Sequence, residues 1–497
     1  MTELDVAGQV VELVRRLAGP DAQAEVTVTR AELALTRFAN SFIHQNVAES
    51  GTAVRLRLHA GGRTAAGSGS LVDPDGLAAL VERTLAAVRL APPDPAWPGL
   101  APPSPVPPGA VFDDATAYAS PDERAARVRA FVDAAGGLET AGYCRTAYRS
   151  GAFANSAGHS TVGRTAEAAM DGIARTGGAD GVARRGADRL GELDGGALGA
   201  RAAAKARAAA DPVELPPGRY DVVLEPAAVA DLLQNLAWFG FNGKRHAERQ
   251  SFVELGTAQF DPSVTLVDDP LHASALPYDM EGTSRGALTL VDAGTTTAVA
   301  HDRRSGAGAG VASTGHAMPG ASTFGPIPHN LRLLPAAARV VNGDSPASSG
   351  ATAGGDSLAA VNGTANGDRP APDAGAAPGD AAPTAGAVAD ADTAALVAGV
   401  RRGLLVSDFW YTRVLDPKRL VITGLTRNGV WLVEDGVPTR AVRDFRFTES
   451  YPRALGPGQV LGLGRQSVRQ PDRVDGSWWE APPVRLASWN FTGGASG

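Results

Sequence analysis

The sequence has almost no cysteine and no long apolar run. The only thiol among its 497 residues is Cys144. One cysteine cannot form an internal disulfide or a thiolate zinc cluster, and it suits a reducing compartment. No window approaches about 18 consecutive apolar residues, so no transmembrane helix is predicted. Residues 1–20 include Glu3 and Asp5 and lack the apolar core of a signal peptide. We therefore expect a cytoplasmic protein.

The net charge of −7 argues against a phosphate-binding surface as the main function. Most of this charge lies in residues 341–396, which contain seven aspartates, one arginine and no aromatic residue. Such a segment cannot bury enough apolar surface to offset its chain entropy, and we expect a disordered acidic insert. The negative charge therefore belongs to the insert and does not indicate a negatively charged active site.

Apolar periodicity changes along the chain. Helical spacing predicts helices at residues 8–18, 73–90, 121–135, 198–209 and 227–238. Between the first two helices, Val54, Leu56 and Leu58 alternate with polar residues, and Gly61-Gly62 follows, which predicts a hairpin. From Tyr220 onward, short apolar segments separated by glycine and acidic residues predict strands at 221–224, 264–267, 287–291, 420–423 and 430–433.

This pattern favours an α+β fold with more than one domain. We expect an N-terminal α/β domain with antiparallel strands and helices over residues 1–190. A helical linker is expected over 191–218, and a β-rich C-terminal domain, containing the acidic insert, over 219–497.

The histidines do not form a metal-binding pattern. A zinc-binding helix needs two histidines about one turn apart. No such pair occurs among His44, His59, His159, His246, His272, His301, His316 and His329. His246 and Glu248 come nearest, but the position one turn beyond His246 is Gln250. We therefore expect no metal site built by this chain alone.

Motifs for nucleophilic catalysis are also missing. No Gly-x-Ser-x-Gly elbow occurs. Cys144 lies between apolar neighbours, as a core residue would. Asp268 and Asp269 are adjacent, would point to opposite faces of a strand, and are interpreted as a turn. Asp279 and Glu281 fit either a cleft or a loop of solvated charge.

Several stretches of the sequence resemble one known family. They are Thr36-Arg37-Phe38-Ala39-Asn40-Ser41 with Gln45-Asn46, then Val222–Leu233 with Val264–Pro270 and Asp279–Thr283, then Leu404–Gly436 with Trp489–Gly493, and finally Asn155–Gly158. Together they resemble the TldD/PmbA family of paired peptidase subunits. The resemblance runs over nearly the whole chain apart from residues 341–396.

The resemblance implies two kinds of subunit. One kind, TldD, holds zinc with a His-Glu-x-x-x-His helix and a C-terminal cysteine, and the other, TldE or PmbA, does not. In this sequence Gln234, Asn235 and Phe239 stand at the three motif positions, and residues 461–467 contain no cysteine. Neutral amides are poor zinc ligands and cannot deprotonate a bound water. The resemblance thus implies a TldE/PmbA-type subunit, a pseudoenzyme that binds no cofactor itself.

The same resemblance implies a heterodimeric metallopeptidase with an internal chamber. The partner would be a TldD-like subunit carrying zinc, and the substrates unfolded or short peptides, in proteolysis or peptide maturation. No nucleic acid or membrane partner is expected. This chain would contribute chamber wall and peptide binding. Arg37, Asn40, Gln45 and Asn46 are the candidate peptide-binding residues because they can hydrogen-bond main-chain amides, although they fit a strand-to-strand contact equally well.

Trp238, Phe239 and Phe241 are expected to fill the position of the missing metal as one aromatic cluster. Two other functions stay open. The chain could be a stand-alone peptide-binding or maturation module without catalysis. It could instead be a metal-independent hydrolase that uses Asp279 and Glu281.

Overall fold

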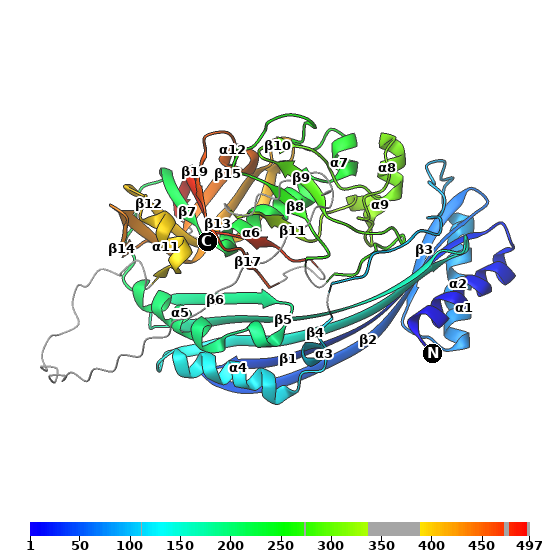
Figure 1. Cartoon of the computed structure of the whole chain (residues 1–497), viewed down its shortest axis with the longest axis horizontal. Helices are drawn as coiled ribbons and strands as arrows, with labels where there is room; N and C mark the ends of the chain where they lie inside the picture. The colour runs from blue at the N-terminus through cyan, green and yellow to red at the C-terminus, as the bar shows by residue number, and fades with distance from the viewer. Residues whose placement is uncertain (111, 273–274, 336–387, 472–476, 495–497) are drawn as a thin grey trace, which may run out of the picture.

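The fold begins with a long, curved antiparallel sheet (Figure 1). The computed structural model describes residues 1–110, 112–272, 275–335, 388–471 and 477–494. Strands of the first sheet lie in the order β3-β2-β1-β4-β5-β6. Their bounds are β1 Gln23–Ala39, β2 Phe42–Ala60, β3 Arg63–Gly69, β4 Glu139–Asn155, β5 Ser160–Arg175 and β6 Asp180–Ala187.

Helices cover one face of this sheet and leave the other face to the rest of the chain (Figure 1). They are α1 Glu3–Ala18, α2 Pro74–Leu90, α4 Pro121–Ala134 and α5 Gly195–Ala208. Because side chains alternate along a strand, Val28, Cys144 and Met170 are buried against the helices. Odd-numbered neighbours such as Thr29 and Arg145 point to the opposite, concave face.

The predicted helices and hairpin of this half are present. Gly61 and Gly62 connect β2 to β3 with φ values of 55° and 71°. Positive φ at both turn positions is the type I′ geometry that matches the twist of paired strands. With a β-rich second half, the chain has the predicted α+β fold.

The C-terminal part contains two further sheets. A six-stranded sheet has the order β10-β9-β8-β11-β18-β17, with bounds β8 Leu266–Asp268, β9 Leu288–Asp292, β10 Thr295–Thr296, β11 Leu331–Leu333, β17 Val468–Arg469 and β18 Glu480–Ala481. A seven-stranded sheet comprises β7 Gly218–Leu224, β12 Arg402–Asp416, β13 Val421–Glu434, β14 Val437–Ala441, β15 Phe445–Ser450, β16 Val460–Leu463 and β19 Val484–Gly494. Because β12 pairs with both β7 and β13, five of these strands form a closed circuit.

Short helices connect the strands of the second half. The remaining helical bounds are α3 Asp114–Ala117, η1 Leu190–Glu192, α6 Pro226–Asn235, η2 Leu236–Gly240, α7 Gly243–Ala247, α8 Arg303–Ala309, α9 Ala321–Phe324, α11 Ala391–Val397 and α12 Tyr451–Ala454. The core of this half is rich in aromatic rings. Phe409 lies 4.4 Å from Phe447 and 5.0 Å from Trp489, measured between ring centres. Leu232 and Leu233 of α6 are buried in the same core.

The two strands predicted at 420–423 and 430–433 are one strand, β13, and the prediction of a turn between them is wrong. Gly424 and Gly429 lie between the two predicted segments. A side chain at Gly424 would collide with Phe447, and one at Gly429 would collide with Trp431. The glycines therefore leave room for buried rings inside a continuous strand.

The predicted insert at 341–396 is too long at its C-terminal end. Residues 341–387 lie outside the described residues, but α11 begins at Ala391. The Asp390 side chain accepts a hydrogen bond from the Thr393 amide and caps this helix. Val388 and Val397 are buried beside β7 and β12 residues, so apolar burial and a helix cap order this segment.

Buried ion pairs connect the first sheet and its helices to the C-terminal part. Lys205 of α5 is 3% exposed and bonds both Glu225 and the Ser407 hydroxyl. Glu225 also accepts a 2.8 Å bond from Arg201. Beside them Arg184 of β6 donates to Asp408 at 2.5 Å. A buried charge is tolerated only with such partners, so these contacts fix how the two parts meet.

The contacts predict that replacing Glu225 lowers the free energy of unfolding more than replacing Lys205 does. Glu225→Gln removes the carboxylate that is bonded to the buried Lys205 and is expected to cost about 3–5 kcal/mol of unfolding free energy. Lys205→Met is expected to cost less because Glu225 keeps Arg201. Denaturant titration of the single and double variants measures both values. An equal or larger cost for Lys205→Met would contradict this assignment.

Candidate functional site

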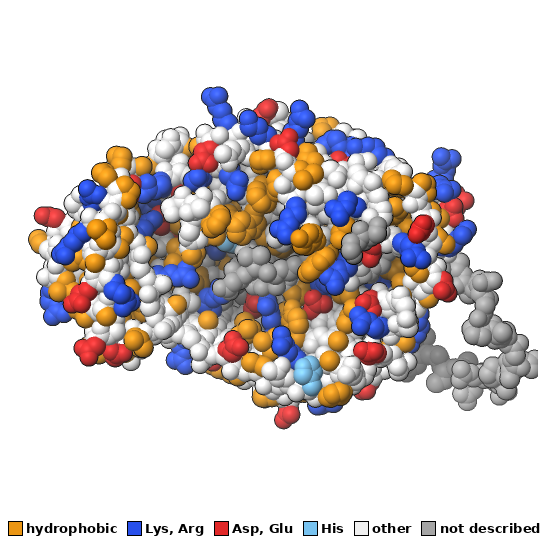
Figure 2. All heavy atoms as spheres, turned by 180° about the vertical axis from the view of Figure 1, so that it is seen from behind, with side chains coloured by type: hydrophobic (Ala, Val, Ile, Leu, Met, Phe, Trp, Pro, Cys, Tyr) orange, Lys and Arg blue, Asp and Glu red, His pale blue; other side chains and the backbone are white. Residues whose placement is uncertain are grey.

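A cavity of about 920 Å³ lies between the concave face of the first sheet and the C-terminal part. Figure 2 views the molecule from behind relative to Figure 1 and shows a hollow near the middle of that face. A second cavity, of about 540 Å³, adjoins the first. Both are lined by Thr27, Arg55, Met280, Ala317, Met318 and Pro319, and the two adjoining cavities together are called the chamber below.

The chamber walls come from both parts of the chain. Odd-numbered residues of the first sheet, such as Thr29 of β1 and Arg145 of β4, form one wall. Loop residues of the C-terminal part, including Asp279 and His316, form the other. Trp238 reaches this second wall from η2, directly after α6. The segment that contains the predicted motif positions therefore reaches the chamber through Trp238.

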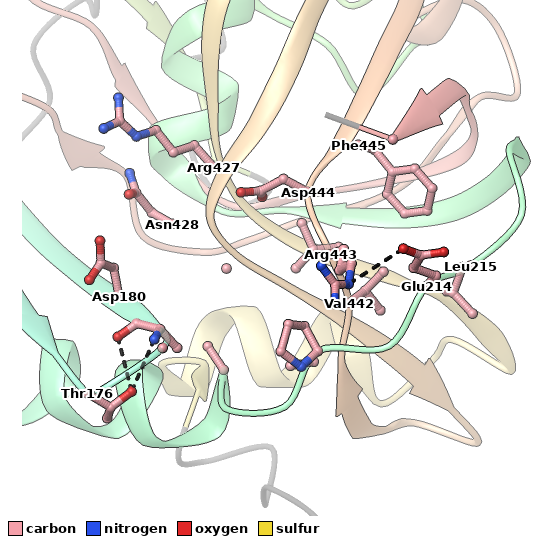
Figure 3. A pocket seen from close by; sticks show the side chains of 18 of the residues that line it. Thr176, Asp180, Glu214, Leu215, Arg427, Asn428, Val442, Arg443, Asp444 and Phe445 are labelled. Atoms are coloured by element: carbon pink, nitrogen blue, oxygen red, sulfur yellow. Dashed lines mark hydrogen bonds and ion pairs between the residues drawn. The ribbon is translucent and has the colours of Figure 1, made fainter. Parts of the chain in front are cut away.

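Another hollow, of about 990 Å³, lies where the β5–β6 turn meets β13 and β15 (Figure 3). Its polar groups already have partners. Thr176 bonds Ala179 across the turn, Asn428 bonds Asp408, and Arg443 pairs with Glu214. Burial raises the pKa of Asp444, whose carboxylate accepts a bond from Thr426. These local contacts make this hollow a weaker candidate than the chamber.

The predicted zinc-motif positions have structural roles. Asn235 is buried, and its amide donates to the Asp231 carbonyl at 2.9 Å and to the Asp231 carboxylate at 3.2 Å. The same carboxylate accepts bonds of 2.8 Å from Tyr451 and Thr412. Gln234 is partly buried at the end of the helix. The Asn235 amide is therefore committed to holding α6 against its neighbours.

A cationic group lies beside the third motif position. The Arg245 guanidinium is 4.9 Å from the centre of the Phe239 ring. Phe239 follows α6 in η2, a single π-helical turn in which the Phe241 amide bonds the Leu236 carbonyl. An amide, an aromatic ring and an arginine do not fit a Zn²⁺ ion, which binds thiolate, imidazole and carboxylate groups. Across the described ranges, no three His, Cys, Asp or Glu side chains are grouped to hold a metal.

The expected aromatic cluster has a different arrangement. Trp238 packs edge-on against Phe324, 6.5 Å away between ring centres. Phe241 packs against Phe252 at 5.8 Å, deeper in the core. The three rings thus have separate partners because consecutive residues of a helical turn point in different directions.

The candidate peptide-binding residues lie together at the far end of the β1–β2 hairpin. Arg37 and Gln45 are cross-strand partners, and all four side chains are exposed. Asn46 accepts a 2.7 Å bond from the Thr36 hydroxyl. Asn40 has φ of 49° in the turn, a conformation that asparagine tolerates better than most residues. None of the four is among the residues that line the chamber.

Asp279 and Glu281 are both buried at the chamber. The Asp279 carboxylate accepts bonds from the backbone amides of Glu281, Thr283 and Ala317, at 2.8–2.9 Å. Burial and the nearby Glu281 raise the pKa of Asp279 to about 7. Glu281 accepts bonds from Arg57 and from the Arg303 amide. These bonds fix the loop, and they occupy the oxygens that a general base would need.

Glu25 of β1 completes this cluster. Arg57 bonds both Glu25 and Glu281, which joins the first sheet to the C-terminal loop. One oxygen of the buried Glu25 carboxyl has no hydrogen-bond partner among the residues that the structure describes. Burial, outweighing the attraction of Arg57, raises the pKa of Glu25 to about 7.

Sequence reasoning missed a buried network centred on Asp268. Asp268 accepts bonds from the backbone amide of Asn330 at 2.6 Å, from His316 at 3.0 Å and from Arg285 at 3.5 Å. Burial alone would raise the pKa of Asp268, but the hydrogen bond from His316 and the charges of His316 and Arg285 lower this pKa to about 2. Asp269 points the other way, toward Arg332, as expected for neighbours on a strand. In the sequence, the only sign of this network was that Asp268 follows the short apolar segment 264–267.

His329 is the second missed group. Its Nδ1 lies 2.8 Å from the Ser477 hydroxyl, and both residues line the chamber. Burial and the charge of Arg285 lower the pKa of His329 to about 3, which keeps the ring neutral. Arginine, neutral histidine and the Trp478 indole give this wall many hydrogen-bond donors, which suit carbonyl and carboxylate groups.

Three solved structures have this fold across almost the whole chain. TldE from Thermococcus kodakarensis is 16% identical, with 98% of this chain and 100% of that chain covered and a TM-score of 0.75. A candidate modulator of DNA gyrase from Bacteroides thetaiotaomicron is 16% identical, with 98% of this chain and 98% of that chain covered and a TM-score of 0.74. Another from Thermotoga maritima is 14% identical, with 98% of this chain and 99% of that chain covered and a TM-score of 0.71. At such low identity these similarities establish the class of fold, a curved α/β half facing a β-rich half.

The family follows from the sequence of the second half. Residues 217–343 and 359–493 match the model of the PmbA/TldA metallopeptidase C-terminal domain, and the chain belongs to this family. The resemblance found in the sequence is confirmed. No curated protein matches the chain. In the described part of the chain, no helix is long and apolar enough to cross a bilayer.

The raised pKa of Glu25 predicts how stability depends on pH. An unfolded glutamate ionises near 4.5 and the folded Glu25 near 7. Its stabilising contribution is therefore full below pH 4.5 and is lost as the pH rises through 7. Glu25→Gln should flatten the decrease in melting temperature over this range.

Melting curves between pH 4.5 and 8 measure this effect. The exposed Glu82 of α2 gives a matched control, because Glu82→Gln should leave the pH dependence unchanged. A Glu25→Gln variant with the same pH dependence as the unaltered chain would rule out the assignment.

Proposed function

We propose that this chain is the TldE/PmbA-type subunit of a heterodimeric zinc metallopeptidase, without metal ligands of its own. Its partner is a TldD-like subunit that carries the His-Glu-x-x-x-His helix and the zinc. The substrates are unfolded or short peptides. This chain supplies one part of the chamber wall and binds the peptide, and the bond is cleaved on the partner subunit.

The observation that carries this proposal is the state of α6 and η2. The chain belongs to a metallopeptidase family, yet Asn235 is bonded to Asp231 and Phe239 lies against Arg245. Both positions contribute to packing, and the positive charge of Arg245 beside Phe239 would oppose the binding of a cation there, which supports the proposal. A scaffold with these replacements needs a second chain to supply the chemistry.

The chamber supports the choice of peptides as substrate. Its total size suits an extended chain segment and excludes a folded domain. The donors on the C-terminal wall, such as Arg285 and His329, can bond peptide carbonyl groups. Exposed Arg37, Asn40, Gln45 and Asn46 lie outside the chamber, and we assign them to guiding the peptide or to contacting the partner.

The hydrolase alternative, based on Asp279 and Glu281, has less support. Its best argument is the pKa of Asp279, raised to about 7 by burial and by Glu281, which would suit a general base. However, three backbone amides already bond the Asp279 carboxylate. A module that only binds peptides remains the other alternative, and the partner experiment distinguishes it.

The proposal predicts activity only in the pair. The purified chain should not cleave an unstructured peptide, and a mixture with the zinc-carrying partner should do so until a chelator is added. Peptide cleavage is measured by mass spectrometry, with the partner alone as control. Chelator-resistant cleavage by the single chain would favour the hydrolase, and peptide binding without any cleavage by the mixture would favour the binding module.

The hairpin residues give a second prediction. A double variant with Arg37→Ala and Asn40→Ala, mixed with the partner, should cleave the peptide at least about tenfold more slowly, since it loses two hydrogen-bonding side chains. Gel filtration of the mixture checks whether the pair still forms. Unchanged turnover by an intact pair would exclude these residues from peptide handling.

A further inference from the structure

One strand of the first sheet has a long open edge. β2 pairs with β1 along its whole length, but β3 pairs only with residues 54–60. Residues 42–53 therefore have a strand on one side only. Throughout the described ranges, no other strand pairs with this segment. Such an edge presents backbone donors and acceptors without partners.

The hairpin fixes which residues point outward. Ala60 and Arg63 flank the two-residue turn and are partners across it. In a type I′ hairpin this flanking pair exchanges both backbone hydrogen bonds, so even-numbered residues of β2 bond toward β3. The register with β1 does not shift between Gln45 and His59, and the alternation continues beyond the end of β3.

The outward-pointing backbone groups of the open edge therefore belong to Asn46, Ala48, Ser50 and Thr52. Each contributes one amide donor and one carbonyl acceptor toward the empty side. The irregularity near His44, where the register with β1 shifts, marks the end of this edge. The remaining length matches a segment of about eight residues at the rise of a β-strand.

The edge lacks the features that usually prevent strand pairing. Residues 45–53 contain no proline, lysine or arginine, and Glu49 is the one charged residue. Most side chains of this segment are exposed, including Ala48 and Ser50. Proteins commonly protect a long edge with a proline, a lysine or a covering element, so an unprotected one indicates a use.

The same edge borders the chamber. Glu49, Ser50 and Gly51 line it, together with residues of β1, β4 and β5. A strand added at this edge would lie along the rim of the chamber, with alternate side chains facing inward. Backbone pairing of this kind binds an extended chain with little regard to its sequence.

We infer that the edge of β2 at residues 46–53 binds a peptide in extended conformation as an additional strand. The inference rests on the proposed function and names the part of this chain that holds the substrate. A second copy of the chain is the competing occupant. The peptide is favoured because the edge is continuous with the chamber wall.

Fluorescence anisotropy of a labelled, proline-free peptide of about ten residues tests the inference on the full chain. Ala48→Pro and Ser50→Pro each remove an outward amide and should weaken binding about tenfold. Proline is tolerated on an edge strand when its missing amide faces outward, so the melting temperature should change little. Ala48→Ser keeps the amide and is the matched control, with unchanged affinity expected.

Peptides methylated on alternate backbone nitrogens test the same point on the unaltered protein. In one peptide the methyl groups block the backbone nitrogens that would face the edge of β2, and this peptide should not bind. In the other peptide the methyl groups lie on the remaining nitrogens, and this peptide should bind normally. Equal affinity of the two methylated peptides, or normal binding by the proline variants, would overturn the inference. Either result would still allow a peptide to bind elsewhere in the chamber. Sedimentation that shows a dimer converted to monomer by Ala48→Pro, without peptide, would assign the edge to a second copy.

Absence of peptide binding by the unaltered chain would also overturn the inference. Cleavage by the mixture with the zinc-carrying partner is a separate measurement, so failure at the edge and failure of the proposed function remain distinguishable.

Discussion

Pairing of buried charges between the first sheet and the C-terminal part determines the shape of the molecule. Arg57 joins Glu25 of the sheet to Glu281 of the opposite loop, and Lys205 joins α5 to Glu225. An unpaired charge at either place would be strongly destabilising, so neither contact can open without cost. The Arg57 contact lies in the wall of the chamber, and the Lys205 contact is a second buried attachment between the two parts.

The same requirement for partners accounts for the contacts of the predicted motif positions in α6 and η2. Polar groups buried in α6 must be bonded, and Asn235 meets that need with Asp231, which Tyr451 and Thr412 also bond. Arg245 packs on Phe239 and adds a positive charge. The replacements form a coherent structural arrangement, which is consistent with a chain whose task is to shape a chamber and hold a substrate.

Local patterns in the sequence predicted the helices, the Gly61-Gly62 hairpin and the family. They failed where distant residues decide the structure. Gly429 indicated a turn but makes room for Trp431 inside β13. Asp268 and His316 are 48 positions apart, and only the fold brings them to 3.0 Å. The open edge of β2 depends on how far β3 extends, which the alternation of residues does not define. The resemblance marked Asn235 as a position of the zinc motif, but its bond to Asp231 required the structure.

The central claim is that this family member has a packed helix in place of a metal site. The most direct test is the zinc content of the purified chain by atomic emission, after dialysis against micromolar zinc. The account predicts far less than one zinc ion per chain, with no change when Asn235 is replaced by alanine. One tightly held zinc ion per chain, lost on replacement of residues in α6 or η2, would contradict it.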